Sequence, residues 1–129
     1  MIFGIGCDII NVERLKNDQA FLDHFIKRSF SDAEKEQFAN LKFAHEKQKT
    51  LYVAKRFAAK EAVAKALGTG FRNGLCLSDI EIFNDELGKP FVFLSENVIE
   101  LGHLPTTAKI HISLSDDFPF AQAVAVIEV

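Results

Sequence analysis

The sequence YVAKRFAAKEAVAKALGTG runs from Tyr52 to Gly70 and is rich in residues of high helix propensity, with five alanines between Ala54 and Ala64. Its ending, Gly68-Thr69-Gly70, is typical of a helix C-terminus. On a helical wheel one side is shared by Ala54, Phe57, Ala58, Glu61, Ala62 and Lys65. A carboxylate and an ammonium group therefore lie one turn apart within a face of small residues, where another segment or a ligand can approach closely.

Two interpretations of this helix are open. Glu61 and Lys65 have the four-residue spacing of an ordinary surface ion pair. Arg56 and Lys60 add positive charge at neighbouring positions, so the helix also suits an anionic ligand. The helix alone favours the surface ion pair, but the N-terminal sequence changes that balance.

The segment from Ile2 to Val12 is predicted to be a strand, because β-branched residues dominate it and its glycines disfavour a helix. Alternation places two sets on opposite faces: Ile5, Cys7 and Ile9 on one, and Gly4, Gly6 and Asp8 on the other. Asp8 is then an acid in an apolar strand, and a buried carboxylate needs a cation, a metal or several donors to stay ionised. The alternative is structural: Asp8 caps the turn around Asn11 or pairs with a lysine.

Composition indicates one globular domain. The chain has 129 residues, of which 48% are hydrophobic and 26% charged, so we expect a single domain over residues 1–129. No apolar run has the length of a membrane span, and the start lacks the features of a signal peptide, so we expect a cytoplasmic protein with no membrane partner. Cys7 and Cys76 form no CxxC pair and are predicted to be free, buried thiols. The four histidines show no metal-ligand spacing.

The net charge of −3 is unevenly distributed. Residues 1–70 hold 12 basic and 9 acidic residues, whereas residues 71–129 hold 3 basic and 9 acidic residues. The first half therefore suits a phosphate-bearing ligand or an acidic protein. Its basic excess is too small, and too mixed with acids, to indicate nucleic acid.

The remaining pattern predicts helices and hairpins. A short helical passage is expected over 13–16, followed by a helix over 18–27. The capping box Ser31-Asp32-Ala33-Glu34 is expected to begin a helix that ends at about Leu41, and a further helix is expected over 95–101. Strands are expected over 78–84, 90–94, 108–115 and 120–129, with a turn at 116–119. This inventory predicts an α+β domain with a mostly antiparallel sheet and helices packed on it.

Five blocks of sequence, taken in order, resemble one enzyme family. They are GIGCDIINVER (4–14), FIKRSFSDAE (25–34), RFAAKEAVAKALGTG (56–70), NDELGKP (84–90) and ISLSDDFPFAQAVAV (112–126). Together they resemble the holo-[acyl-carrier-protein] synthases, the short bacterial 4'-phosphopantetheinyl transferases. Any one block is a weak motif, but the five together cover nearly the whole chain.

The resemblance implies transfer of 4'-phosphopantetheine from coenzyme A to a serine of apo acyl carrier protein in fatty acid synthesis, with release of adenosine 3',5'-bisphosphate. It also implies a magnesium-dependent homotrimer with active sites between neighbouring subunits. The metal-binding residues of the family fall on Asp8 and Glu61, and the lysine near the coenzyme A phosphates falls on Lys65.

The chemistry of these residues agrees with that implication. Phosphoryl transfer needs charge neutralisation and alignment, and magnesium prefers one or two carboxylates together with water and substrate phosphate. Lys65 is a compact charge for phosphate, with Arg56 and Lys60 as further candidates for binding coenzyme A. The base that takes the proton of the attacking serine is expected to be Glu61 or Asp8 acting through a metal-bound water, and the sequence does not choose between them.

Two other features belong to the coenzyme A site as the resemblance implies it. Backbone donors at Gly68 and Gly70 suit the nucleotide part, although a plain helix cap explains both glycines equally well. In the last block the family has Ser-His followed by an acid, whereas this chain has Ser115-Asp116-Asp117. Two consequences of the missing imidazole are open: phosphate affinity or the pH profile differs, or Lys65 and Arg56 compensate.

Acyl carrier proteins are strongly acidic, so cations near Asp8 are expected to dock the partner. Arg14 and Arg28 are the candidate docking cations, with Lys27 beside them, and Phe25 is the candidate apolar centre of the contact. The alternative is that the cations are solvated and that Phe25 belongs to the core.

Two competing functions use the same residues. A metal-dependent phosphoesterase would attack with water, but no His/Asp cluster is evident to activate that water. A non-catalytic binding protein descended from such a transferase would explain Asp116, but it has no need of the Asp8–Glu61 carboxylate pair.

Overall fold

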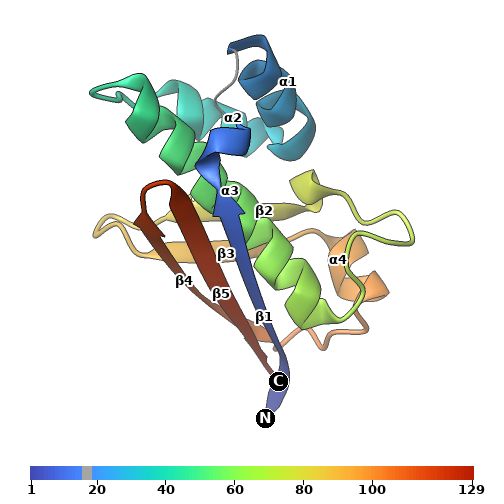
Figure 1. The fold of residues 1–129 in the computed structure, drawn as a ribbon. Helices are drawn as coiled ribbons and strands as arrows, with labels where there is room; N and C mark the ends of the chain where they lie inside the picture. The colour runs from blue at the N-terminus through green and yellow to red at the C-terminus, as the bar shows by residue number, and fades with distance from the viewer. Residues whose placement is uncertain (16–18) are drawn as a thin grey trace.

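The computed structural model of the protein describes residues 1–15 and 19–129 (Figure 1). The elements along these residues are β1 (Ile2–Asn11), η1 (Val12–Arg14), α1 (Gln19–Ser29), α2 (Asp32–Ala39), α3 (Glu46–Leu67), η2 (Leu77–Asp79), β2 (Ile80–Asn84), β3 (Pro90–Leu94), α4 (Glu96–Leu101), β4 (Lys109–Asp117) and β5 (Phe120–Glu128). The predicted α+β class is confirmed. The predicted helical elements over 13–16 and 18–27 meet at residues 16–18, which lie outside the described residues.

The strands form two antiparallel groups. β5 lies between β1 and β4 in a three-stranded sheet, and β2 pairs with β3 in a separate hairpin. Both predicted hairpins are therefore confirmed. The two ends of the chain lie side by side, and the Met1 ammonium donates to the Val129 carbonyl at 2.7 Å.

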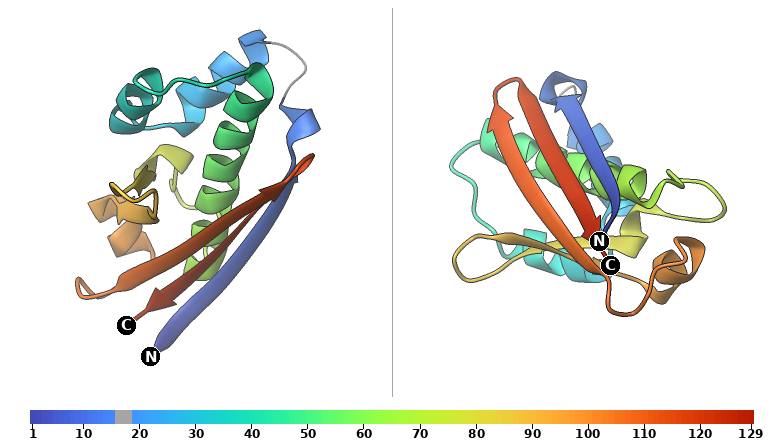
Figure 2. Two further views of the ribbon diagram at one scale, coloured as in Figure 1. Left: turned by 90° about the vertical axis from the view of Figure 1, so that its left-hand side faces the viewer. Right: turned by 90° about the horizontal axis from the view of Figure 1, so that it is seen from below.

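Helix α3 packs on one face of the three-stranded sheet, and no other described segment covers the opposite face (Figure 2). Alternation along β5 explains this arrangement, because its small or apolar inward residues are fully buried: Ala121, Ala123, Ala125 and Ile127. The outward face is apolar but exposed, with Ile5 66% exposed and Ile9 62% exposed.

Two glycines of β1 let α3 approach the sheet closely. A Cβ atom built on Gly6 would lie 1.8 Å from the carbonyl oxygen of Ala62, and one on Gly4 would lie 1.9 Å from that of Ala66. No side chain larger than hydrogen fits at such distances. Gly4 and Gly6 therefore fix α3 against β1, and the next residue on the same face of the strand is Asp8.

The long helix has well-defined ends. It begins at Glu46, where the His45 side chain accepts from the Gln48 amide, and it ends at Gly68, whose φ of 80° is left-handed. The capping box at Ser31 and Glu34 that starts α2 is also confirmed. Over the described residues, no helix combines the length and the apolar character needed to cross a bilayer.

Three predictions need correction. The strand expected from residue 78 begins at Ile80, because Leu77–Asp79 form a 3-10 turn, and Asp116 and Asp117 continue β4 instead of turning the chain. Cys7 and Cys76 are free but exposed, not buried. For Cys7 the reason is strand alternation, which directs its side chain to the uncovered face of the sheet.

Candidate active site

Lys65 joins the end of α3 to β1 beside Asp8. Its Nζ lies 3.0 Å from Asp8 Oδ1 and donates to the Cys7 carbonyl at 2.9 Å. The Asp8 side chain is 16% exposed, whereas that of Lys65 is 52% exposed. The hydrogen bond to Asp8 raises the pKa of the Lys65 ammonium above its usual value, so the group is protonated at neutral pH. The structural alternative for Asp8, pairing with a lysine, is thus realised in the protein as described.

Glu61 is the second carboxylate of the site, one turn before Lys65 on α3. Partial burial raises the pKa of its carboxyl above the usual value, and the negative charge of Asp8 raises it further, while Lys65 lowers it. The charge of Asp8 acts on Glu61, so the two carboxylates, one on β1 and one on α3, lie near enough to interact.

The donor set suits a divalent cation. Across residues 1–15 and 19–129 no three side chains of His, Cys, Asp or Glu cluster as metal ligands, so the site offers two carboxylates. Magnesium commonly binds one or two carboxylates and completes its shell with water and substrate phosphate. A cation between Asp8 and Glu61 would relieve the repulsion that raises the Glu61 pKa. The residues present therefore fit magnesium.

A cavity of about 650 Å³ borders Glu61. Its wall comes from α1, α3 and the segment before η2, with Phe21, His24, Phe25, Arg28, Ser29, Glu61, Phe71, Leu75, Cys76 and Leu77 as lining residues. Two of the three predicted docking residues, Phe25 and Arg28, thus line the same cavity as Glu61. Phe25 also packs edge-on against Phe57 of α3 at a centroid distance of 5.2 Å, so it belongs in part to the core.

Arg14 lies apart from that cavity, exposed at the end of η1. Its position at the end of the strand that carries Asp8 keeps it on the same part of the molecule as α1. The structure neither adds to nor removes its predicted role in docking.

Lys60, which the sequence offers as a coenzyme A ligand, has its side chain in the core. Its ammonium is fully buried, 2.6 Å from Glu34 Oε1, and it donates to the carbonyls of Leu77 and Ile80. Burial lowers the pKa of Lys60, whereas Glu34 raises it. One residue along a helix turns the side chain by about 100°, which points Lys60 into the core while Glu61 faces the cavity. The sequence signal that was missed is Glu34, which serves both the capping box and this ion pair.

Arg56 is also buried, at 4% exposure, and it is directed away from Asp8. Its guanidinium stacks on Tyr52 at 4.6 Å, and Nη2 donates to Asn84 Oδ1. Nη1 is buried and has no hydrogen-bond partner among the described residues. A buried guanidinium N–H without an acceptor is costly, so it marks a place where an acceptor from a ligand would be stabilising.

Tyr52 and Asn84 belong to a second, polar cavity of about 550 Å³. It is lined by two cations, an anion, three amides, two aromatic rings and two leucines: Lys42, Lys55, Asp116, Gln37, Gln48, Asn84, Phe43, Tyr52, Leu41 and Leu51. Asp116, which stands where the family has histidine, pairs here with Lys55, its Oδ2 2.9 Å from Nζ. Lys55 was not among the predicted site residues.

Three further predicted ligands lie outside the Asp8 site. The amides of Gly68 and Gly70 already donate to the carbonyls of Lys65 and Ala64, which agrees with the helix-cap interpretation of both glycines, and their contact with a nucleotide stays a prediction. Ser115 is exposed on β4, where alternation directs it to the uncovered face of the sheet, opposite to Asp8. Within one chain the structure does not bring Ser115 to the carboxylate pair.

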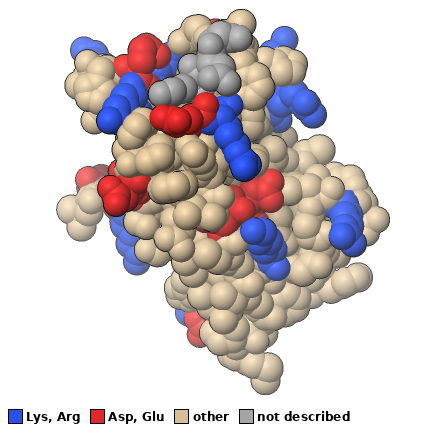
Figure 3. Space-filling view, in the orientation of Figure 1, with Lys and Arg blue, Asp and Glu red and all other residues tan. Residues whose placement is uncertain are grey.

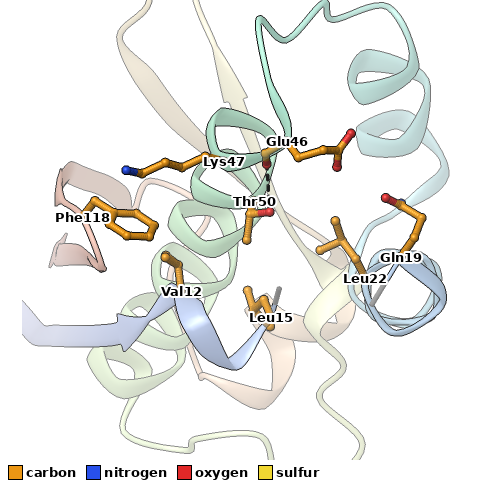
Figure 4. A pocket seen from close by; sticks show the side chains of 8 residues that line it. All are labelled: Val12, Leu15, Gln19, Leu22, Glu46, Lys47, Thr50 and Phe118. Atoms are coloured by element: carbon orange, nitrogen blue, oxygen red, sulfur yellow. Dashed lines mark hydrogen bonds between the residues drawn. The ribbon is translucent and has the colours of Figure 1, made fainter. Parts of the chain in front are cut away.

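A third cavity, of about 390 Å³, lies between η1, α1, the start of α3 and the β4–β5 turn (Figure 4). Its walls are largely apolar, from Val12, Leu15 and Leu22, and its Thr50 hydroxyl already donates to the Glu46 carbonyl. At the edge of the cavity, Lys47 Nζ lies over the Phe118 ring, 3.8 Å from the ring centroid. Glu46 is the single acid among the described residues that line this cavity, so it offers no carboxylate pair like that of Asp8 and Glu61.

The whole chain matches known proteins of one family. Residues 4–124 match the 4'-phosphopantetheinyl transferase superfamily. The holo-[acyl-carrier-protein] synthase of Clostridium tetani is 44% identical over 99% of this chain and 97% of its own length. That of Orientia tsutsugamushi (strain Ikeda) is 46% identical over 98% of this chain and 97% of its own.

Solved structures agree with the sequence matches. The holo-[acyl-carrier-protein] synthase of Neisseria meningitidis superposes with a TM-score of 0.82 at 34% identity, over the full length of both chains. That of Bacillus anthracis, solved in complex with CoA (3',5'-ADP), gives a TM-score of 0.79 at 38% identity, over 98% of this chain and 96% of the other. The chain therefore belongs to the holo-[acyl-carrier-protein] synthases, within the 4'-phosphopantetheinyl transferase superfamily.

Proposed function

We propose that this chain transfers the 4'-phosphopantetheine group of coenzyme A to a serine hydroxyl of apo acyl carrier protein, releasing adenosine 3',5'-bisphosphate. The observation that carries the proposal is the meeting of Asp8 and Glu61 beside Lys65, held in place by the close contact of α3 with Gly4 and Gly6. The solved relatives that hold coenzyme A or 3',5'-ADP support the donor.

Asp8 and Glu61 would hold magnesium, which when bound supplies neutralisation of the pyrophosphate charge as the leaving bisphosphate departs. Lys65 is protonated, half exposed and anchored through Asp8, so its ammonium is placed to bind phosphate oxygens. These groups align and stabilise charge, which is most of what phosphoryl transfer requires from a protein.

We assign the proton of the attacking serine to Glu61. Glu61 borders the cavity that contains Phe25 and Arg28, where the carrier protein is proposed to dock. Asp8 lies on the strand behind it, hydrogen-bonded to Lys65.

The carrier protein is proposed to dock on α1 and η1. Arg14 and Arg28 are exposed there and suit an acidic partner, and the ring of Phe25 offers an apolar contact at the cavity wall. The apolar lining of this cavity, from Phe71, Leu75 and Leu77, suits the pantetheine arm as it passes from donor to acceptor.

The nucleotide end of coenzyme A is proposed to lie in the second cavity, with Arg56 behind its wall. Lys55 is six residues before Glu61, which corresponds to about 240° around the helix, so this cavity does not face the carboxylates of the same chain. One coenzyme A molecule would then contact both sites only if neighbouring subunits share it. We therefore propose a homotrimer with active sites between subunits.

The uncovered face of the sheet supports that assembly. Ile5, Ile9 and Phe120 are exposed there, and the lower part of the molecule over the ends of β1, β4 and β5 shows few charged side chains (Figure 3). A contiguous exposed apolar face of this kind is typical of an interaction surface. Ser115 lies on this face, so the neighbouring subunit is where its predicted contact with coenzyme A would occur.

The test is the intact mass of purified apo acyl carrier protein after incubation with this protein, coenzyme A and magnesium. We expect a gain of one phosphopantetheine group, lost with a chelator and lowered at least about a thousandfold in rate in Asp8→Asn and Glu61→Gln. Glu100→Gln, an exposed acid on α4, is the matched control and should leave the rate unchanged. Bisphosphate release without carrier protein would indicate a phosphoesterase. Coenzyme A binding with no transfer would indicate a non-catalytic binder.

A further inference from the structure

Cys76 contributes a thiol to the wall of the cavity that borders Glu61. The cysteine is free and exposed, and it lies on the segment that joins α3 to η2. Its amide donates to Asp79 Oδ2 at 3.1 Å, which holds the backbone in place at the start of η2. Its Sγ lies 3.8 Å from the Gly74 carbonyl oxygen, a weak contact that leaves the sulfur accessible from the cavity.

A second group in the same wall points to a ligand. Ser29 of α1 is only 2% exposed and lines the cavity, and no hydrogen bond joins its hydroxyl to another of the described residues. A buried hydroxyl without a partner is costly, so a polar group of a ligand that reached it would be stabilised. Apolar side chains surround it in the wall, among them Phe71, Leu75 and Leu77. The cavity therefore suits an apolar chain that carries a hydrogen-bonding group.

The proposed function places the pantetheine arm of coenzyme A in this cavity, and the present inference rests on that proposal. The arm is a mostly apolar chain with two amide groups, which match the apolar walls and the Ser29 hydroxyl. It ends in a thiol. A coenzyme A molecule whose pyrophosphate lies at the site of Glu61 and Lys65 therefore directs its sulfur into the cavity that Cys76 lines.

We propose that Cys76 is a site of reversible modification by coenzyme A disulfide, the oxidised form of the donor substrate. The Cys76 thiol loses its proton to water, and the thiolate attacks one sulfur of the reagent. The sulfur–sulfur bond of the reagent breaks, a bond forms between Cys76 and one coenzyme A, and the other coenzyme A leaves as a thiolate. One disulfide replaces another, so no further oxidant is consumed. The attached coenzyme A then fills the cavity beside Glu61 and stops transfer until a thiol reductant releases it.

Cys7 is an internal reference for this reaction. It is also free and exposed, but strand alternation directs it to the uncovered face of the sheet, away from the cavity. Its Sγ accepts from Gln122 Nε2 at 3.5 Å. A disulfide that is not recognised by the coenzyme A site has no reason to prefer either cysteine beyond its accessibility. The ratio of the rates of two reagents at each cysteine therefore separates recognition from accessibility.

The experiment follows adduct formation by intact mass and peptide mapping, with coenzyme A disulfide and oxidised glutathione at equal concentration and no carrier protein. Cys76 should react at least about tenfold faster with coenzyme A disulfide than with oxidised glutathione, because binding brings the reagent to the thiol. Cys7 should show no such preference. Adenosine 3',5'-bisphosphate should slow the reaction of coenzyme A disulfide at Cys76.

The effect on transfer is measured on the same samples. Wild type treated with coenzyme A disulfide should lose transfer and regain it with dithiothreitol. Cys76→Ser should keep after treatment whatever rate it has before treatment, and Cys76→Ala should behave in the same way. Thermal unfolding of both variants checks that the fold is intact.

Other outcomes overturn the proposal. Equal rates of the two reagents at Cys76 would make it an exposed thiol without recognition, and an adduct that the bisphosphate does not slow would mean that the coenzyme A site does not direct the reaction. Labelling is measured without carrier protein, so it is independent of transfer. A protein that transfers phosphopantetheine but shows no preference at Cys76 rejects this inference alone. A protein that shows the preference but does not transfer rejects the transferase and keeps Cys76 as a modification site, and one that shows neither rejects both.

Discussion

Gly6 lies so close to the carbonyl of Ala62 that a Cβ atom would stand 1.8 Å from the oxygen. Gly4 has the same relationship with the carbonyl of Ala66, which lies one helical turn after Ala62. These contacts bring α3 onto β1 at the level where Glu61 and Lys65 meet Asp8. The glycines are therefore as much a part of the site as the charged residues.

Gly6→Ala should displace α3 from β1 and separate the carboxylates. Because the clash is with backbone and not with a flexible side chain, we expect a loss of at least about 2 kcal/mol in the free energy of unfolding. Urea unfolding measures the stability, and the rate of mass gain of the carrier protein measures transfer. Glu100→Gln, at an exposed acid on α4, is the control and should change neither. A stable and fully active Gly6→Ala would show that the approach of α3 is not required.

Glu34→Gln should be strongly destabilising, because it leaves the fully buried Lys60 ammonium without its counter-charge. Removing one member of a buried ion pair typically costs about 3–5 kcal/mol. Glu34 also accepts from the Ile82 amide at 3.1 Å, so the pair fastens α3 to β2. Guanidinium unfolding is the measurement.

The control for that experiment is a surface pair on the same helix as Glu34. Lys35 lies 3.9 Å from Asp32 in an exposed position, and Lys35→Met should change the stability by no more than about 0.5 kcal/mol. The double variant Glu34→Leu/Lys60→Met should recover part of the loss, since it leaves no unpaired charge. Equal stability of Glu34→Gln and wild type would mean that Lys60 is neutral in the folded protein.

Local sequence signals predicted most of the fold. The alanine-rich helix with its glycine ending, the capping box at Ser31 and the alternation in β1 each act within a few residues, and each is confirmed. The same alternation placed Asp8 on the face that meets α3. The boundaries around 78 and 116 failed because a 3-10 turn and a strand extension depend on the partner strands and not on the local sequence.

The surroundings of the cations could not be predicted from the local sequence. Lys60 and Arg56 precede Glu61 on the same helix, but both are buried, and their side chains donate to Glu34 of α2 and Asn84 of β2. Only long-range packing decides which of several neighbouring cations is buried. Lys55 was missed for the same reason, because its partner Asp116 comes from the far end of the chain.

Glu61 should give the stability a characteristic pH dependence in the absence of metal. Its folded pKa is raised above the unfolded value of 4.5, so the ionised form is disfavoured by folding. The contribution of Glu61 to stability therefore falls as the pH rises from 4.5 through the folded pKa, and above that the penalty is complete. With a chelator present, Glu61→Gln should melt at a higher temperature than wild type at pH 7.

The two proteins should melt together below pH 4.5, where Glu61 is protonated whether the chain is folded or not. Addition of magnesium should reverse the order at pH 7, since a cation that binds only the folded wild type stabilises it by mass action. Thermal scans at several pH values, with and without magnesium, measure both effects. A Glu61→Gln protein that melts below wild type in chelator would contradict the strained carboxylate pair.

Ile9→Glu should separate the subunits of the proposed homotrimer. Ile9 is 62% exposed on the uncovered face of the sheet. A glutamate at this position would stay in water in a single chain, but in the assembly it would be buried without a counter-charge. Light scattering coupled to gel filtration should give about three chain masses for wild type and one for the variant, with the circular dichroism of both unchanged. Transfer should fall with the assembly, because the proposed coenzyme A site takes its two halves from different subunits. Phe93→Glu is the matched control: Phe93 is 61% exposed on β3, outside the three-stranded sheet, so its replacement should leave both mass and transfer as they are. A monomeric and fully active Ile9→Glu protein would show that one chain holds the whole site, and the cavity at Lys55 would then need another ligand.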